Sequence, residues 1–161
     1  MKTYVIMIAQ KFPAGHPRAG QPTNFAKRIR TREDVGGIGI GLYKIHTIRE
    51  NFPLWQKRFA EIDAGRACLS LRIWEGTPYR SKQIELEKLT AKDGIGLQEL
   101  KLIPPKNEHM RFYTTHVDGR YIYSPIIANG DGLLLPDWDA WFEHHDTKEP
   151  LAIIHFTNYR Y

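Results

Sequence analysis

The sequence predicts an α+β protein with one domain, a small mixed β-barrel carrying about three short helices. Its 161 residues suit a single domain that buries a core. Hydrophobic residues make up 42% of the chain and charged residues 25%, as in ordinary globular proteins. About six or seven short segments rich in β-forming residues alternate with turns rich in Gly and Pro. Many short strands with scattered helices favour a small barrel, while the pattern alone leaves its topology open.

The first part of the chain is expected to contain a strand, two loops and a short helix. Thr3–Ala9 is rich in β-forming residues and predicts the strand. The loop after it is dense in Pro and Gly, which fit neither a helix nor a paired strand. Thr23 or Asn24 can cap a helix over residues 25–30. The sequence GGIGIG at residues 36–41 predicts the second loop, and without a βαβ unit around it the glycine spacing does not indicate a dinucleotide site.

The longest helix is expected over residues 51–65. Asn51 is a good N-cap, Gly65 is a good C-terminal stop, and Trp55 and Phe59 belong to one apolar face. The remaining expected elements are, in chain order, strands over Ala67–Trp74, Gln83–Leu89 and Leu97–Ile103, a hairpin within residues 111–125 around Asp118 and Gly119, a short helix from Pro136, and a closing strand within residues 151–161.

Positive charge is concentrated near the N-terminus. The chain has a net charge of +5, yet residues 1–32 hold seven Lys and Arg and no acidic residue, so the rest of the chain is slightly negative. A basic segment on a near-neutral body is typical of a protein that binds an anionic partner, most often a phosphate backbone. Arg18, Arg30 and Arg32 are therefore candidate ligand contacts. The alternative is a positive face that only keeps the protein in solution.

Cysteine, histidine and hydropathy patterns exclude several other classes of protein. Cys68 is the only cysteine, so no internal disulfide can form, and its apolar neighbours indicate a buried, inert thiol. No apolar run reaches about 20 residues, and the N-terminus lacks the features of a secretory signal. We therefore expect a cytoplasmic protein without a membrane span. The seven histidines show no ligand spacing, and we expect neither a metal site nor a cofactor.

The segment from Lys44 to Arg49, with the sequence KIHTIR, carries the most informative chemistry. In a regular strand Lys44 and His46 point to one side and Thr47 and Arg49 to the other, whereas in a turn Lys44 and Thr47 could meet. A desolvated lysine loses its proton more readily and can activate a neighbouring hydroxyl as a nucleophile. The guanidinium of Arg49 suits a phosphate or a carbonyl oxygen. The alternative is an ordinary loop with a lysine and an arginine on its surface.

This segment resembles the K-x-x-T-I-R signature of ASCH domains, which are relatives of the PUA fold. The order of the elements after it is similar to that of the family. A glycine-led strand fits Gly65–Trp74 and a second strand fits Gln83–Leu89. An acidic residue, Asp131, then precedes a short helix and a closing strand. The resemblance therefore implies a PUA-like barrel.

The resemblance covers residues 42–157, with an insertion near residues 93–125. In front of this core, residues 1–41 are interpreted as a basic strand and loop. The whole chain, residues 1–161, is thus expected to form a single ASCH-type domain.

Small ASCH relatives that deacetylate N4-acetylcytidine have a proposed catalytic group that consists of the signature Lys and Thr with a later Glu. The resemblance implies Lys44 as the base, Thr47 as the nucleophile and Asp131 as the acidic residue, with Asp93 as the second choice. Because Asp is one methylene shorter than Glu, this chain departs from the family pattern at that position.

Three functions remain open on the sequence. The first is a module that binds RNA or a base-containing small molecule, with His46, Tyr79 and Arg80 as further contacts and Tyr79 stacking on a base. Packing of Tyr79 on Trp74 within a turn is the alternative for that residue. The second function is a metal-independent amidohydrolase acting on an acylated nucleoside such as N4-acetylcytidine. The third is a protein-interaction domain, because a fold does not dictate its function.

Overall fold

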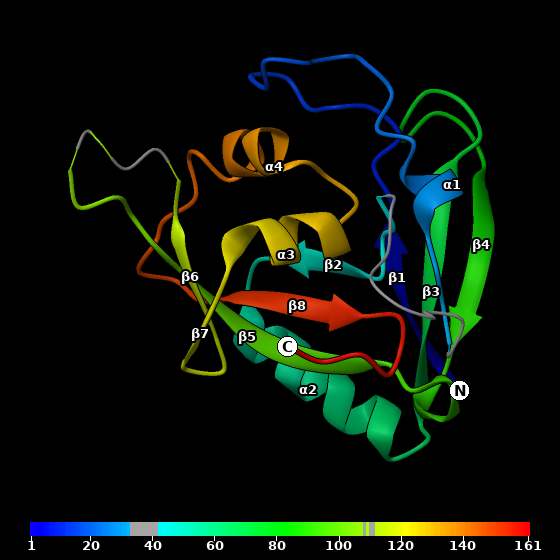
Figure 1. The fold of residues 1–161 in the computed structure, drawn as a ribbon. Coiled ribbons are helices and arrows are strands. Elements are labelled where there is room, and N and C mark those ends of the chain that lie inside the picture. The colour runs from blue at the N-terminus through cyan, green and yellow to red at the C-terminus, as the bar shows by residue number, and fades with distance from the viewer. Residues whose placement is uncertain (33–41, 108, 110–111) are drawn as a thin grey trace.

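Two β-sheets and four α-helices make up the described part of the chain (Figure 1). The computed structural model describes residues 1–32, 42–107, 109 and 112–161. The fold is mixed α+β, as the sequence predicts. Its strands form two separate sheets and do not close into the expected barrel. No described helix is long and apolar enough to cross a membrane, and the loop expected at residues 36–41 lies outside the described residues.

The three-stranded sheet has the order β1-β3-β4. β1 (Lys2–Met7) runs parallel to β3 (Ala67–Trp74), and β4 (Gln83–Leu89) pairs antiparallel with the other edge of β3. β1 ends earlier than expected, because the chain leaves β3 after the N–H of Ile8 bonds to the carbonyl of Arg72. The N-terminal strand is therefore an integral part of a sheet.

The five-stranded sheet is antiparallel and has the order β2-β8-β5-β6-β7. Its strands are β2 (His46–Arg49), β5 (Gly96–Ile103), β6 (Thr114–Val117), β7 (Arg120–Ile122) and β8 (Leu151–His155). Every residue of β8 is buried, as expected of an interior strand. Asp118 and Gly119 both have positive φ and form the predicted hairpin turn between β6 and β7. The segment near residues 93–125, interpreted in the sequence as an insertion, supplies three paired strands to this sheet.

Helix α2 (Phe52–Asp63) connects the two sheets and confirms the predicted long helix. The side chain of Asn51 accepts a hydrogen bond from the N–H of Leu54 at 3.1 Å and so caps the first turn. Trp55, Phe59 and Ile62 are buried at the spacing of one helix face. This face packs against β3 and β5, one strand from each sheet, so the core lies between the sheets and α2.

The shorter helices differ more from expectation. α1 (Phe25–Arg28) is shorter than the expected 25–30, because Ile29 leaves the helical backbone and bridges to Lys44. The sequence does not predict α3 (Ser124–Gly130), whose first two residues fall at the end of the predicted hairpin segment. The remaining elements are α4 (Leu135–Trp141) and a single 3-10 turn over Ala91–Asp93.

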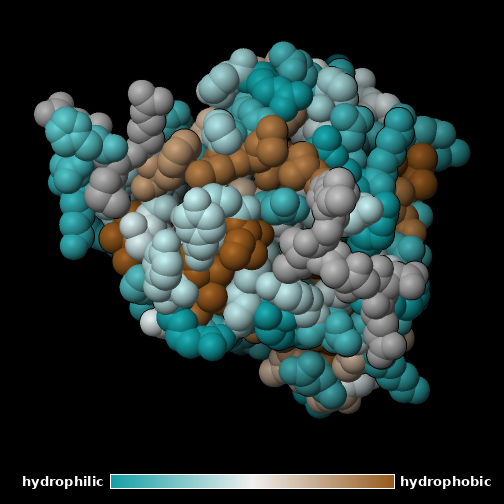
Figure 2. All heavy atoms as spheres, in the orientation of Figure 1, coloured by the Kyte–Doolittle hydropathy of each residue, from teal (hydrophilic) through white to brown (hydrophobic). Residues whose placement is uncertain are grey.

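Apolar residues gather on one face of the molecule over α3 and its connection to α4 (Figure 2). Ile126 is 41% exposed and Leu134 is 60% exposed in this region. Polar residues surround the apolar patches in this view.

Candidate functional site

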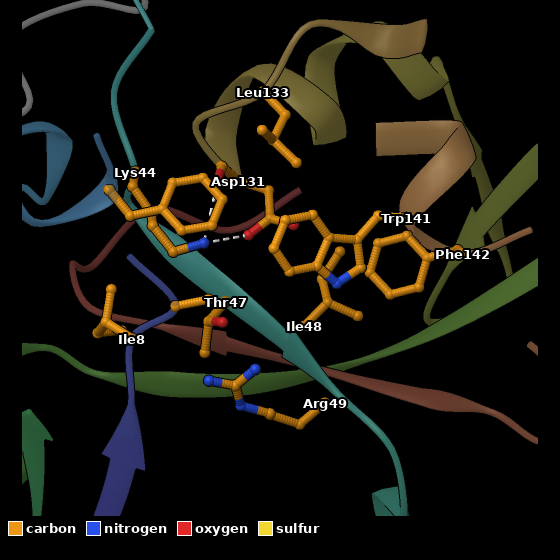
Figure 3. A pocket seen from close by; sticks show the side chains of 11 residues that line it. Ile8, Lys44, Thr47, Ile48, Arg49, Asp131, Leu133, Trp141 and Phe142 are labelled. Carbon is orange, nitrogen blue, oxygen red and sulfur yellow. Dashed lines mark hydrogen bonds and ion pairs between the residues drawn. The ribbon is translucent and has the colours of Figure 1, made fainter. Parts of the chain in front are cut away.

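A narrow hollow lies beside β2, between the end of β1, α1 and the region of α4 (Figure 3). Its polar side chains are those of Lys44, Thr47, Arg49 and Asp131. Its other lining residues are apolar: Ile8, Ala9, Phe25, Ile48, Leu133, Trp141 and Phe142. The centre of a water molecule can occupy about 20 Å³ of the hollow, which is room for roughly one water or one small polar group. The four polar residues singled out in the sequence thus line a common space.

An interruption at Ile45 brings Lys44 to the side of Thr47. β2 pairs with β8 only from His46 onward. The N–H of Ile45 donates to the carbonyl of the last residue of α3 at 2.8 Å, and Lys44 forms an isolated bridge to Asp131. In an unbroken strand Lys44 would share the face of His46. Because the strand is broken between them, the lysine side chain reaches the hollow and the imidazole does not.

Lys44 and Asp131 form a buried ion pair. The ammonium nitrogen of Lys44 lies 2.5 Å from Oδ1 of Asp131, and it also donates to the backbone carbonyl of Asp131 at 3.0 Å. The same nitrogen lies 4.1 Å from the centre of the Phe25 ring. Lys44 is 2% exposed and Asp131 is 5% exposed. The short Asp side chain reaches the lysine because residue 131 directly follows α3 and bridges to residue 44 through its backbone.

Burial shifts the pKa of each partner in the direction that favours its neutral form. Desolvation lowers the pKa of Lys44, the charge of Asp131 opposes this shift, and the charge of Arg49 adds to it. Desolvation raises the pKa of Asp131, and the charges of Lys44 and Arg49 oppose it. The pKa values of Lys44 and Asp131 are therefore closer to each other than they would be in water. Such a pair is suited to exchange a proton with a bound molecule.

Thr47 and Arg49 complete the polar lining of the hollow. Thr47 is 3% exposed, and its hydroxyl forms no hydrogen bond with any described residue. Arg49 is half-buried, and its Nη2 donates to the carbonyl of Met7 at 2.6 Å. Within the described ranges no carboxylate forms an ion pair with Arg49. Both side chains therefore keep hydrogen-bonding capacity for a ligand.

A wider cavity of about 490 Å³ shares the residues Ile8 and Ala9 with the hollow. Its far wall is formed by Trp74 and Tyr79, whose ring centres lie 5.3 Å apart at an angle of 50°. Tyr79 is 89% exposed and has a φ of 63°, a region that residues other than Gly rarely adopt. The ring thus packs on Trp74 and still leaves most of its surface open. Arg80 is exposed and does not line this cavity.

A second wide cavity of about 510 Å³ borders the hollow. It shares four residues with the hollow: Ile48, Arg49, Trp141 and Phe142. Its remaining lining residues are Glu50, Trp55, His144, His145 and Leu151. The spacing of Trp55 and Trp141 in the sequence does not show that α2 and α4 contribute to one cavity beside β2. The hollow thus shares lining residues with two larger cavities.

His46 lies outside the hollow, contrary to its assignment as a ligand contact. Its Nε2 and the hydroxyl of Tyr161 are 2.7 Å apart, and its ring centre is 5.6 Å from that of His155. Both ring nitrogens of His155 are buried and have no hydrogen-bond partner in the described residues. A side chain at Gly130 would collide with His46 and Tyr161, which explains why glycine ends α3. His46 thus belongs to a closed cluster on the other side of β2.

Two of the arginines predicted as ligand contacts form ion pairs with carboxylates of the protein itself. Arg18 pairs with Asp137 at 2.6 Å. Arg32 pairs with Asp93 at 3.0 Å and with Glu87 at 3.5 Å. Asp93 also accepts hydrogen bonds from the backbone and hydroxyl of residue 90, so it caps the 3-10 turn and does not line the hollow.

Arg30 differs from these two arginines. Its guanidinium lies 4.6 Å from the centre of the Tyr43 ring and donates only to backbone carbonyls among the described residues. Of the three predicted arginines, Arg30 therefore has the charge most available to a phosphate.

Neither the family models, nor the curated proteins, nor the solved structures that we compared with the chain gave a match. Within residues 1–32, 42–107, 109 and 112–161, no group of three or more His, Cys, Asp or Glu side chains could hold a metal ion. The site must therefore be interpreted from its own geometry.

Removal of one partner of the Lys44–Asp131 pair should destabilise the protein more than removal of both. Asp131→Asn leaves a buried ammonium without its counter-ion, so we expect the free energy of unfolding to fall by about 3–5 kcal/mol. The double variant Lys44→Met/Asp131→Asn removes both charges and should recover part of this loss. Urea unfolding of the three proteins measures the effect. Equal losses in the single and the double variant would contradict an energetic coupling between the two groups.

Acid should destabilise the fold through His46 and His155. Burial lowers the pKa of His155 to about 3 and that of His46 well below its usual range. Below about pH 6.5 the unfolded chain binds protons that the folded chain does not, so each buried histidine lowers the free energy of unfolding by about 1.4 kcal/mol per pH unit. This loss should continue as the pH falls toward 3.

Urea unfolding between pH 7 and pH 4.5 tests the role of these histidines. His155→Phe should reduce the pH dependence by about 1.4 kcal/mol per pH unit, whereas Thr77→Ala, at an exposed position without a titratable group, should leave it unchanged. A pH dependence that is the same in both variants would rule out His155 as its source.

Proposed function

We propose that this chain is a PUA-like module of the ASCH type that binds RNA or a base-containing small molecule at the hollow beside β2. One observation carries the proposal: Lys44, Thr47 and Arg49 of the K-x-x-T-I-R segment line the same hollow as Asp131, which comes from a distant part of the chain. Convergent polar groups within a mostly apolar wall are typical of ligand sites. The signature supports the choice of family, and the shape of the hollow supports the kind of ligand.

The hollow fits a single polar group of the ligand. Its free space of about 20 Å³ is too small for a ring but admits an exocyclic oxygen or amino group of a base. Lys44 uses two N–H groups on Asp131, which leaves one of its three for a ligand. Thr47 can donate or accept a hydrogen bond. These groups can distinguish bases by the polar atoms on one edge.

The cavity beside Trp74 and Tyr79 fits the ring of the base. It adjoins the hollow through Ile8 and Ala9, so a ring in the cavity can direct one edge into the hollow. The open surface of Tyr79 offers a stacking platform, and stacking on aromatic side chains is a common mode of base recognition. Arg30 is the candidate for contacts with an RNA backbone, since Arg18 and Arg32 are engaged with carboxylates.

Loss of the exposed tyrosine should weaken base binding. Tyr79→Ala removes the stacking surface, and we expect the dissociation constant for a short single-stranded RNA to rise about 5- to 100-fold. Tyr79→Phe keeps the ring and should bind like the unmodified protein. Tyr121→Ala is a matched control, because Tyr121 is 62% exposed and lies on β7 outside the cavity. Titration followed by tryptophan fluorescence or calorimetry measures the constants. If Tyr79→Ala and Tyr121→Ala bind equally well, the stacking role is wrong.

Hydrolysis of an N-acylated base is the second candidate function, and the unengaged hydroxyl of Thr47 beside the Lys44–Asp131 pair favours it. In this reaction Oγ of Thr47 attacks the amide carbonyl carbon while its proton passes to the neutral amine of Lys44. The C–N bond then breaks, and the departing amino group takes the proton from Lys44. Water finally cleaves the acyl-threonine ester and releases the carboxylic acid. Arg49 can stabilise the oxyanion through its free N–H groups.

Incubation with N4-acetylcytidine tests this reaction. We expect release of cytidine and acetate, loss of turnover by at least about 100-fold in Lys44→Ala and in Thr47→Val, and partial retention in Thr47→Ser, which keeps the hydroxyl. Chromatography of the nucleosides measures the rates. Absence of turnover in the unmodified protein, or equal turnover in Thr47→Val, would exclude this mechanism and leave the binding function untouched.

A further inference from the structure

We propose that the 510 Å³ cavity beside Arg49 is an anion subsite and that the ligand carries a phosphate, so that it is a nucleotide rather than a nucleoside. This inference rests on the proposed function for the base-containing part of the ligand. The anion subsite itself is argued from Arg49 and from the groups around it.

Arg49 is placed to hold an anion at the boundary of the hollow and this cavity. Its side chain lines both spaces, and its guanidinium lies near Thr47 at the edge of the hollow (Figure 3). One of its N–H groups donates to the carbonyl of Met7 at 2.6 Å, which fixes the orientation of the planar group. The remaining N–H groups form no hydrogen bond or ion pair with the described residues. A fixed guanidinium with free donors is well suited to bind two oxygens of a phosphate.

The charges that line the hollow do not balance. Lys44 and Arg49 each contribute one positive charge, and Asp131 contributes one negative charge. Asp131 is already in contact with Lys44 at 2.5 Å. A partly buried charge without a partner is costly, and an anionic ligand removes this cost. The net charge of +1 at the hollow therefore favours a ligand with a negative group near Arg49.

The other walls of the cavity strengthen the attraction of an anion to Arg49. Trp55 is buried and Trp141 is half-buried, so both present apolar surface that reduces the water around a bound group. His145 is engaged with the carbonyl of Glu149 at 2.9 Å. His144 is exposed and forms no hydrogen bond with the described residues, so its ring N–H is available to a second phosphate oxygen.

Among the described residues that line this cavity, Glu50 is the only carboxylate, and its position limits its effect. Its side chain is 82% exposed, and its Oε1 lies 3.7 Å from Nδ1 of His145. Water and salt screen an exposed charge much more strongly than a half-buried one. Glu50 therefore weakens the site at low ionic strength without cancelling the charge of Arg49.

The experiment compares nucleosides with their monophosphates. Calorimetry measures dissociation constants for the four ribonucleosides, their 5′- and 3′-monophosphates and a dinucleotide. We expect at least one monophosphate to bind about 10-fold or more tightly than its nucleoside. The 5′- and 3′-series show which phosphate position fits, and the dinucleotide shows whether a phosphodiester can replace a terminal phosphate. Arg49→Gln should reduce the preference for the monophosphate to about 2-fold or less, and His144→Gln should reduce it to an intermediate value.

Arg66→Gln is the matched control, because it also removes one arginine charge but lies at an exposed position outside the cavity; it should preserve the preference. Inorganic phosphate provides a test that needs no substitution: at millimolar concentration it should weaken monophosphate binding and spare the nucleoside. Equal affinity of the unmodified protein for nucleosides and monophosphates would overturn the anion subsite. If neither kind of ligand binds while the protein is folded, the proposed function itself has failed.

Discussion

The contact between the ammonium of Lys44 and the carboxylate of Asp131 is the interaction on which the site depends. It fixes the segment before β2 against the end of α3, two parts of the chain that are far apart in sequence. Burial of two charges is unfavourable unless other groups support them. Here the carbonyl of Asp131 accepts a second hydrogen bond, and the ring of Phe25 lies under the ammonium. The backbone of Lys44 also joins residues 28–30 through its N–H and its carbonyl. A single buried lysine thus holds α1, β2 and α3 in one arrangement.

The interruption at Ile45 gives the two sides of β2 different chemistry. On one side Thr47 and Arg49 share the hollow with Lys44. On the other side His46 packs with His155 and Tyr161 in a closed cluster that burial keeps uncharged. Because a regular strand alternates its side chains, a lysine two residues before His46 would otherwise lie in that cluster. The break in the ladder therefore separates a hollow lined by charged groups from a buried aromatic cluster across a single strand.

Local patterns in the sequence predicted the elements whose signals lie within a few residues. Asn51 and the apolar face of Trp55 and Phe59 gave α2, and Asp118 with Gly119 gave the hairpin turn. α3 is not predicted because Pro125 fits the end of the hairpin segment in the sequence. Proline is also common in the first turn of a helix, which is its position in α3. The two-sheet arrangement was missed because strand order depends on long-range pairing, such as that of β1 with β3, which no local pattern encodes.

The polar residues of the site were easier to predict than its walls. Lys44, Thr47, Arg49 and Asp131 follow from a short signature and an element order, and they do line one hollow. The side to which His46 points depends on a backbone break that single-strand periodicity cannot show. Trp55 of α2 and Trp141 of α4 line one cavity beside β2 only through the tertiary fold, which their spacing in the sequence does not encode. The sequence therefore identifies the charged residues of the site, whereas the shape of the cavities is known only from the structure.

The two candidate functions make opposite demands on Lys44. As a base, Lys44 must be neutral; burial is the main cause that lowers its pKa, and the nearby charge of Arg49 adds a smaller effect in the same direction. An anion bound to Arg49 cancels that influence and keeps the ammonium protonated. A phosphate-bearing ligand would therefore be held firmly by the site and hydrolysed slowly, whereas an uncharged acylated nucleoside would leave Lys44 better able to accept the proton of Thr47. A negative charge on the ligand near Arg49 thus favours binding over hydrolysis at this hollow, because it favours the protonated form of Lys44.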